Sequence, residues 1–191
     1  MEKTISFSVV GFGRIGQRHA KIVQEYAQAK LIAVIDTDEN QFEIATDLKL
    51  NAICYSTIQE FIKKDNNQSD VVNIATPNGY HTDYAIALLE AGYHVVIEKP
   101  MGLSIADCQD VIKAMERSGK KVFVVKQNRY SPPSMWLKEV VEKNIIGDVL
   151  MVQTNCYWNR DERYYSTSPW RGTRELDGGA LFTQFSHFID I

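Results

Sequence analysis

Hydrophobic residues in the first 125 positions gather in six short runs, and segments with helical spacing separate most of them. The runs stand in "ISFSVVGFG", "KLIAVID", "NAICYS", "DVVNIATP", "HVVIEKP" and "KVFVVKQNR". Short apolar runs closed by turn residues predict strands that are buried in a parallel sheet. Strands alternating with amphipathic helices predict βαβ units in a doubly wound α/β fold, which binds ligands at the carboxyl ends of its strands.

Two of the predicted helices carry start signals. Thr57 with Glu60, and Ser104 with Asp107, are spaced so that a hydroxyl and a carboxylate satisfy the free N–H groups of the first turn. Gly119 is expected to end the second of these helices, because glycine tolerates the left-handed backbone that follows many helices.

The pattern of hydrophobic and polar positions changes beyond residue 130. "SPPSMWLKEVVEK" predicts a helix that starts at proline, and "GDVLMVQTNCYWNR" predicts a longer strand because its apolar positions roughly alternate. "ALFTQFSHFIDI" again has helical spacing, and the chain ends on Ile191 without the usual helix stop signals. We expect a complete domain at residues 1–125 and an incomplete second α/β domain at 126–191. A chain of this kind should bind a cofactor without completing a reaction.

Composition and charge narrow the class of protein. The 191 residues are 45% hydrophobic, with a net charge of −3 and a pI near 5.8, so no basic field favours nucleic acid or an anionic membrane. No signal peptide is indicated, and no run approaches the roughly 18 apolar residues that a membrane span needs. Cys54, Cys108 and Cys156 are widely spaced and odd in number, which favours neither a disulfide framework nor a zinc site. These features predict a cytoplasmic globular protein without a structural metal.

A glycine-rich turn follows the first predicted strand. "VVGFGRIG" places Gly11, Gly13 and Gly16 between a strand and a helix, the context that a dinucleotide-binding fingerprint requires. Asp36 follows Gly16 by 20 residues, at the end of the second strand, where its carboxylate would bind ribose hydroxyls and repel a 2′-phosphate. NAD is therefore favoured over NADP in a Rossmann-type sheet, and the alternative is a plain glycine turn. The residues predicted to bind the cofactor also include Phe12, Arg14 and Ile15.

Two further turns belong to the same sheet edge. Thr76, Pro77 and Asn78 close the fourth strand and would meet the cofactor, although an ordinary turn would explain them too. Lys99 ends the fifth strand, where its ammonium would polarise a substrate hydroxyl and favour the alkoxide-like charge of a hydride-transfer transition state. Glu98 would pair with Lys99 or face the nicotinamide ribose; a strand-end salt bridge is the alternative. Pro100 fixes this turn, with a cis bond as one option. His81 is assigned to packing at the start of a helix.

The whole chain carries an ordered set of motifs: the glycine loop, Asp36, "TPN", "EKP", "QNR" and a terminal "GG…H…D". In this set the chain resembles the Gfo/Idh/MocA oxidoreductases along its whole length. The resemblance implies an NAD(P)-binding domain followed by an α/β domain, and dehydrogenation at a sugar or polyol carbon. It implies that Lys99 and His187 are catalytic. It places Asn128 at the cofactor, and Arg129, Tyr130 and Thr183 at the substrate. Many members carry Asp where this chain has Thr183, and Thr cannot hold a negative charge beside an imidazolium. Without the resemblance, a histidine on an apolar helix is more often a core residue.

The loop from Tyr157 to Arg174 is rich in aromatic residues and arginines, among them Trp158 and Arg171. Aromatic faces suit sugar C–H edges, and guanidinium groups suit carboxylate or phosphate. The loop therefore favours an acidic or nucleotide-linked sugar, with an oligomer interface or core packing as the alternative.

Three hypotheses for the function remain. The first is an NAD(P)-dependent oxidoreductase that oxidises a secondary hydroxyl of a sugar, polyol or nucleotide-sugar, and forms a homo-oligomer in its full-length form. The second is a non-catalytic, NAD-responsive binding or regulatory protein on the same scaffold. The third is an S-adenosylmethionine-dependent methyltransferase, which shares glycine loops and acidic strand ends.

Overall fold

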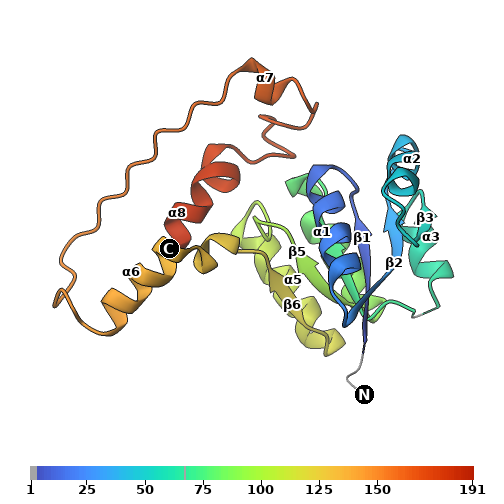
Figure 1. Ribbon diagram of the computed structural model, residues 1–191, viewed down its shortest axis with the longest axis horizontal. Coiled ribbons are helices and arrows are strands. Elements are labelled where there is room, and N and C mark those ends of the chain that lie inside the picture. Colours follow the sequence, from blue (N-terminus) through green and yellow to red (C-terminus); the bar gives the residue numbers. More distant parts are fainter. Residues whose placement is uncertain (1–3, 67) are drawn as a thin grey trace. The chain divides into compact units, whose positions relative to one another are not determined.

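The computed structural model describes residues 4–66 and 68–191 (Figure 1). The chain divides into two compact units, Met1–Val124 and Val125–Ile191.

The first unit is built on one parallel sheet of six strands. The strands are β1 (Ile5–Val10), β2 (Ala29–Ile35), β3 (Ile53–Tyr55), β4 (Val71–Ile74), β5 (His94–Ile97) and β6 (Val122–Val124). Their order in the sheet is β3-β2-β1-β4-β5-β6, and every neighbouring pair is parallel. The chain progresses outward in both directions from β1 and β4, which confirms the predicted doubly wound fold. The crevice where the direction reverses lies between the carboxyl ends of β1 and β4.

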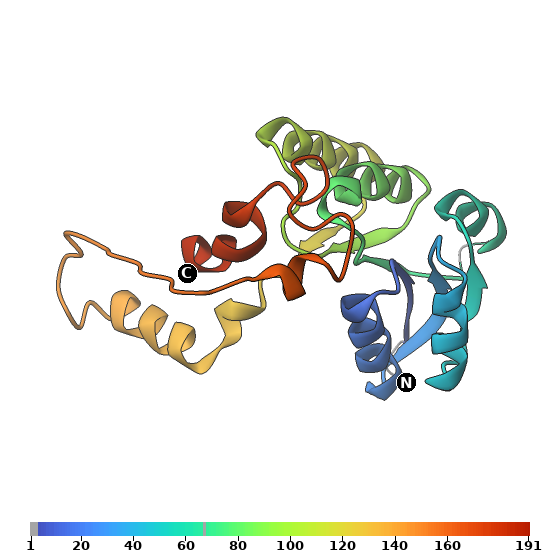
Figure 2. The same cartoon turned by 90° about the horizontal axis from the view of Figure 1, so that it is seen from above.

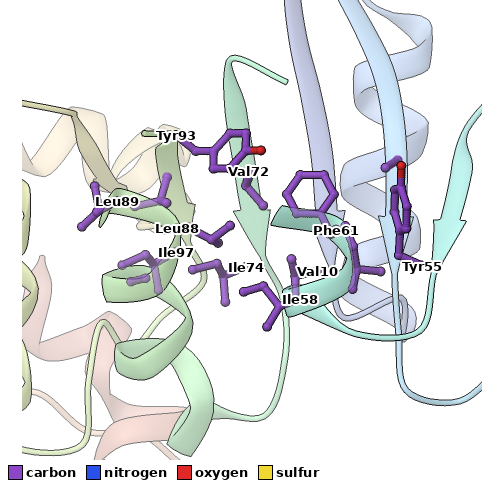
Figure 3. Packing of buried hydrophobic residues seen from close by; sticks show 14 of the residues in the cluster. Val10, Tyr55, Ile58, Phe61, Val72, Ile74, Leu88, Leu89, Tyr93 and Ile97 are labelled. Carbon is purple, nitrogen blue, oxygen red and sulfur yellow. The ribbon is translucent and has the colours of Figure 1, made fainter. Parts of the chain in front are cut away.

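Helices cover both faces of this sheet. They are α1 (Arg14–Glu25), α2 (Asn40–Asp47), α3 (Ile58–Lys64), α4 (His81–Glu90) and α5 (Ile105–Ser118). Figure 2 shows α1 and α2 on one face and α3, α4 and α5 on the other. Adjacent residues of β1 point to opposite faces: Val9 packs with Ala20 and Val23 of α1, whereas Val10 belongs to the larger cluster around Phe61 and Leu88 (Figure 3).

The predicted helix caps are present. Thr57 Oγ1 accepts from the N–H of Glu60 at 3.1 Å, and Ser104 Oγ accepts from the N–H of Asp107 at 3.1 Å. In return, Glu60 and Asp107 accept from the N–H groups one residue before the caps, those of Ser56 and Leu103. After α5, Gly119 adopts the left-handed conformation with φ of 65°, as predicted.

The regular structure in the described residues of the second unit consists of helices and helical turns. A 3-10 turn at Gln127–Tyr130 leads into α6 (Pro132–Glu142), whose first position is proline as predicted. A short α7 (Glu162–Tyr165) follows, and a π-helical turn at Leu181–Phe185 continues into α8 (Ser186–Asp190).

Two predicted strand segments are wrong. "QNR" forms the 3-10 turn instead of continuing β6, which ends at Val124. Residues 149–160 form no sheet ladder, although the chain between α6 and α7 is drawn out (Figure 1). A strand is stable only where neighbours take its backbone N–H and C=O groups, and the described part of this unit offers no partner strand.

Across residues 4–66 and 68–191, no helix is long and apolar enough to cross a lipid bilayer. In the same part of the chain, no group of three His, Cys, Asp or Glu side chains is arranged to hold a metal ion.

Candidate functional site: a dinucleotide site at the carboxyl edge of the sheet

The glycine loop connects β1 to α1, and two of its glycines are required by contacts within the protein. Gly11 has φ of 84°, and a Cβ there would lie 2.7 Å from the carbonyl carbon of Ala75. A Cβ on Gly16 would lie 1.9 Å from the carbonyl oxygen of Gly11, so α1 packs directly on the loop. Only glycine allows both close approaches.

Gly13 is different, because a Cβ there would meet no atom of the described protein within 4 Å. Gly13 is the N-cap residue of α1, and no side chain caps the helix. The N-terminus of α1, at Arg14 and Ile15, therefore begins beside open space, with unsatisfied N–H groups and the positive end of the helix dipole. This combination fits a pyrophosphate, whose oxygens accept such N–H groups.

Asp36 lies where β2 ends and is tied to the glycine loop. One carboxylate oxygen accepts from the N–H of Phe12 at 2.6 Å, and the other accepts from the N–H of Asp38 at 2.9 Å. Each oxygen keeps a lone pair for a further donor. The carboxylate is therefore held at the loop with capacity for ribose hydroxyls, and its charge opposes a 2′-phosphate.

The turns after β4 and β5 lie at the same edge as the glycine loop. β4 pairs with both β1 and β5 in parallel, so the ends of the three strands are neighbours. Thr76, Pro77 and the buried Asn78 follow β4, and Asn78 begins a 3-10 turn. Lys99 follows β5, and the Lys99–Pro100 peptide bond is cis. All cofactor contacts predicted in the first unit thus gather at one sheet edge.

Glu98 has a partner that the sequence did not indicate. Its Oε1 lies 2.9 Å from His19 Nε2 on α1, and its Oε2 accepts from the N–H of Lys99 at 3.3 Å. His19 and Glu98 are both largely buried, with 15% and 16% of their side chains exposed. The helical position of His19 was visible in the sequence, but a partner 79 residues away was not.

His81 is a second residue that sequence reasoning assigned only to packing. It is the first residue of α4 and is 1% exposed. Its Nδ1 lies 2.7 Å from the carbonyl oxygen of Pro100, and its Nε2 lies 3.0 Å from that of Thr76. The imidazole therefore spans the two turns that carry Thr76 and Lys99.

The second unit holds the other predicted residues. His187 lies on α8 and is buried; the side-chain amide nitrogen of Gln127 lies 3.4 Å from its Nε2. Thr183 lies in the π-helical turn before α8 and donates its hydroxyl to the carbonyl of Gly179 at 2.9 Å. Asn128 lies in the 3-10 turn that also carries Gln127.

Arg129 and Asp190 form a bidentate ion pair with two contacts of 2.7 Å. The hydrogen bonds from Arg129 hold the pKa of Asp190 below its ordinary value, and Lys126 at 3.7 Å adds to this effect. Arg129, predicted at the substrate, thus anchors the end of α8 to the 3-10 turn. Tyr130, next to it, is 79% exposed.

The loop around α7 forms a stack of aromatic rings and guanidinium groups. Arg160 lies over the rings of Trp158 and Tyr164, at 4.1 and 4.4 Å from their centroids. Arg171 lies over Tyr164 and Trp170, at 4.5 and 4.8 Å. Among the described residues, no acceptor lies within hydrogen-bond distance of the buried Nε atoms of Arg160 and Arg171. The stack therefore buries two guanidinium donors between aromatic faces without an acceptor from the described residues.

Comparison with known proteins assigns the chain to a family. A family profile described as an oxidoreductase family with an NAD-binding Rossmann fold matches residues 5–126, and the GFO/IDH/MocA C-terminal domain matches residues 135–191. The chain belongs to the Gfo/Idh/MocA oxidoreductases. This confirms the resemblance, the Rossmann-type fold and NAD as the cofactor of the first unit, and it argues against the methyltransferase hypothesis.

Among solved structures, the chain is similar to the WlbA dehydrogenases of Chromobacterium violaceum and Bordetella pertussis. They are 35% and 34% identical, with TM-scores of 0.93 and 0.92, over 99% of this chain and 54% of each of theirs. Both were solved in complex with NADH and UDP-GlcNAcA. An inositol 2-dehydrogenase/D-chiro-inositol 3-dehydrogenase of Halalkalibacterium halodurans is 29% identical over 98% of this chain and 51% of its own length. The chain thus spans about half the length of the relatives it matches.

Proposed function

We propose that the chain belongs to an NAD-dependent dehydrogenase that oxidises a secondary hydroxyl of an acidic or nucleotide-linked sugar. The observation that carries this proposal is the position of Lys99. Lys99 lies two residues beyond the end of β5, and β5 is two strands from the glycine loop, in the half of the sheet that receives the nicotinamide in a doubly wound fold. A fixed ammonium at that place stabilises an alkoxide.

The residues divide the chemistry between them. The glycine loop and Asp36 hold the pyrophosphate and the adenosine ribose, while Thr76 and Asn78 border the nicotinamide half. NAD supplies the hydride acceptor when it is bound. His187 takes the hydroxyl proton as general base, and Gln127 orients its ring. Lys99 stabilises the negative charge that the oxygen acquires as its proton leaves, and loss of the hydride from the carbon then gives a ketone.

The stacked arginines support the substrate class. The guanidinium groups of Arg160 and Arg171 suit a carboxylate or a diphosphate, and the rings of Trp158 and Trp170 beside them suit a sugar or base. The ligand found in the WlbA dehydrogenases combines these groups, because it is a uridine-diphosphate-linked uronic acid.

The test uses the whole protein with NAD and a panel of sugars: a UDP-linked uronic acid, its UDP-linked neutral counterpart and an inositol. We expect NADH to form fastest with the uronic acid. Lys99→Met and His187→Gln should each lower kcat by about 10² or more, the scale of losing one preorganised charge or general base. Lys113→Met, an exposed lysine on α5, is the matched control and should leave kcat unchanged.

Binding of NADH without turnover of any sugar in the panel would contradict the proposal and favour a non-catalytic NAD-binding protein. Preference for the inositol over both nucleotide sugars would contradict the substrate class alone.

A further inference from the structure

His81 lies between two turns that the proposed function uses separately. Its two ring nitrogens face the carbonyl oxygens of Thr76 and Pro100 at 3.0 and 2.7 Å. The first carbonyl immediately precedes Pro77 and Asn78, and the second immediately follows Lys99. The side chain is 1% exposed, so its position is fixed by packing as well as by these contacts.

Both turns belong to one half of the dinucleotide site. In a doubly wound sheet the adenosine half of NAD lies over the strands on the β1, β2 and β3 side, where Asp36 ends β2. The nicotinamide half lies over β4, β5 and β6. His81 thus bridges the two turns that border the nicotinamide, and both of its ring nitrogens are directed at these turns.

The hydrogen-bonding capacity of the imidazole determines which side chains could replace His81 in this bridge. A neutral imidazole has one N–H, so it donates to one carbonyl, and only the imidazolium donates to both. Burial lowers the pKa of His81, whereas the two carbonyls and Glu98 raise it and Lys99 lowers it further. A side chain without ring nitrogens leaves the carbonyls of Pro100, which is buried, and Thr76, which is partly buried, without this partner.

We propose that His81 is a positioning residue that fixes the separation of the turns at 76–78 and 98–100, and so places the nicotinamide half of NAD against Lys99. The role of Lys99 rests on the proposed function, but the effect on cofactor binding does not. The proposal therefore has a readout that needs no turnover.

The experiment compares NADH with ADP-ribose, which lacks the nicotinamide, by isothermal titration calorimetry. The parent chain should bind NADH more tightly than ADP-ribose. His81→Phe should weaken NADH by about tenfold, the scale of one or two lost hydrogen bonds, and leave ADP-ribose within about twofold. His81→Gln, which keeps an N–H donor, should recover part of the loss.

His94→Phe is the matched control, because His94 lies at the opposite end of β5, where its Nδ1 accepts from the N–H of Lys121 at 2.9 Å. It should leave the ratio of the two affinities unchanged.

Two results would overturn the proposal: equal loss of NADH and ADP-ribose affinity in His81→Phe, or loss of neither. If His81→Phe does not fold, the same comparison in His81→Gln decides, because a parent-like ratio of affinities there would equally overturn it. Absence of sugar oxidation by the parent would contradict the proposed function. It would not bear on the role of His81, which the ratio of NADH to ADP-ribose affinity tests.

Discussion

His19 Nε2 lies 2.9 Å from Glu98 Oε1, which joins helix α1 to the residue that precedes Lys99. Because α1 lies on the sheet face opposite to α4, the turn at 98–100 is held from both faces, by His19 on one side and by His81 on the other. These supports would hold the ammonium that we propose for catalysis in a fixed position, which matters because small displacements of a reacting group lower the rate steeply.

The contact between His19 and Glu98 should appear as an energetic coupling. In a double-mutant cycle of His19→Phe and Glu98→Gln, we expect a coupling of about 1 kcal/mol in the free energy of unfolding, because both groups are mostly buried. Urea unfolding of the four proteins measures it. The exposed pair Lys113–Asp110 serves as control and should show no measurable coupling. Strictly additive effects at His19 and Glu98 would contradict the prediction.

Substitutions at two glycines of the loop should have different effects, one on NADH binding and the other on the stability of the fold. Gly13→Ala should keep near-parent stability, because its Cβ meets no atom of the described protein, yet it should weaken NADH at least about tenfold by entering the space for the pyrophosphate. Gly11→Ala should instead lower the free energy of unfolding by about 2 kcal/mol or more, since its Cβ clashes with the backbone at Ala75. Thermal unfolding and calorimetry measure the two effects. Unchanged NADH affinity in Gly13→Ala would count against a pyrophosphate at this position.

Asp36 should decide between the two nicotinamide cofactors. Asp36→Asn keeps an acceptor oxygen for the N–H of Phe12 but removes the charge, so the preference for NADH over NADPH should narrow by about tenfold. Fluorescence titration with both cofactors gives the ratio. Asp47→Asn removes a charge at the exposed end of α2 and should leave the ratio at the parent value. Equal affinity of the parent for both cofactors would refute the assignment.

The buried His81 should make the protein less stable in mild acid. Burial lowers its pKa, so the unfolded chain, with an ordinary pKa of about 6.5, takes up a proton before the folded protein does. The stability contributed by the neutral ring is complete above the unfolded pKa and is lost as the pH falls towards the lowered folded pKa. Urea midpoints between about pH 7.5 and about pH 5 should therefore fall more steeply in the parent than in His81→Gln. Parallel pH profiles would show that His81 has the same pKa in the folded and unfolded protein, and would contradict the prediction.

The sheet and its ligand-binding edge were predictable because local patterns determine them. Buried runs such as "KLIAVID" have no polar face to present to water, so a parallel sheet is the stable arrangement, and the glycine spacing then marks the turn between β1 and α1. Helix α2 was harder to foresee, since Asn40 to Asp47 show no clear apolar stripe.

The features that sequence could not supply depend on distant partners. Alternation at residues 149–160 is a property of one segment, but a sheet also needs a neighbour, and the described residues of that unit provide none. The contacts of His19 with Glu98, and of His81 with Pro100, join residues 79 and 19 positions apart. Only the packing of α1 and α4 on the sheet determines which carboxylate or carbonyl each ring meets.

The three glycines of the loop also limit how this scaffold could evolve or be redesigned towards another ligand. Gly11 and Gly16 are required by close contacts with the protein's own backbone, so the fold needs them whatever ligand the site binds. Gly13, in contrast, is constrained only by the ligand that occupies the open space beside α1. A change in cofactor would therefore be expected to begin with substitutions at Gly13 and Asp36. Gly11 and Gly16 would be retained, because the fold itself requires them.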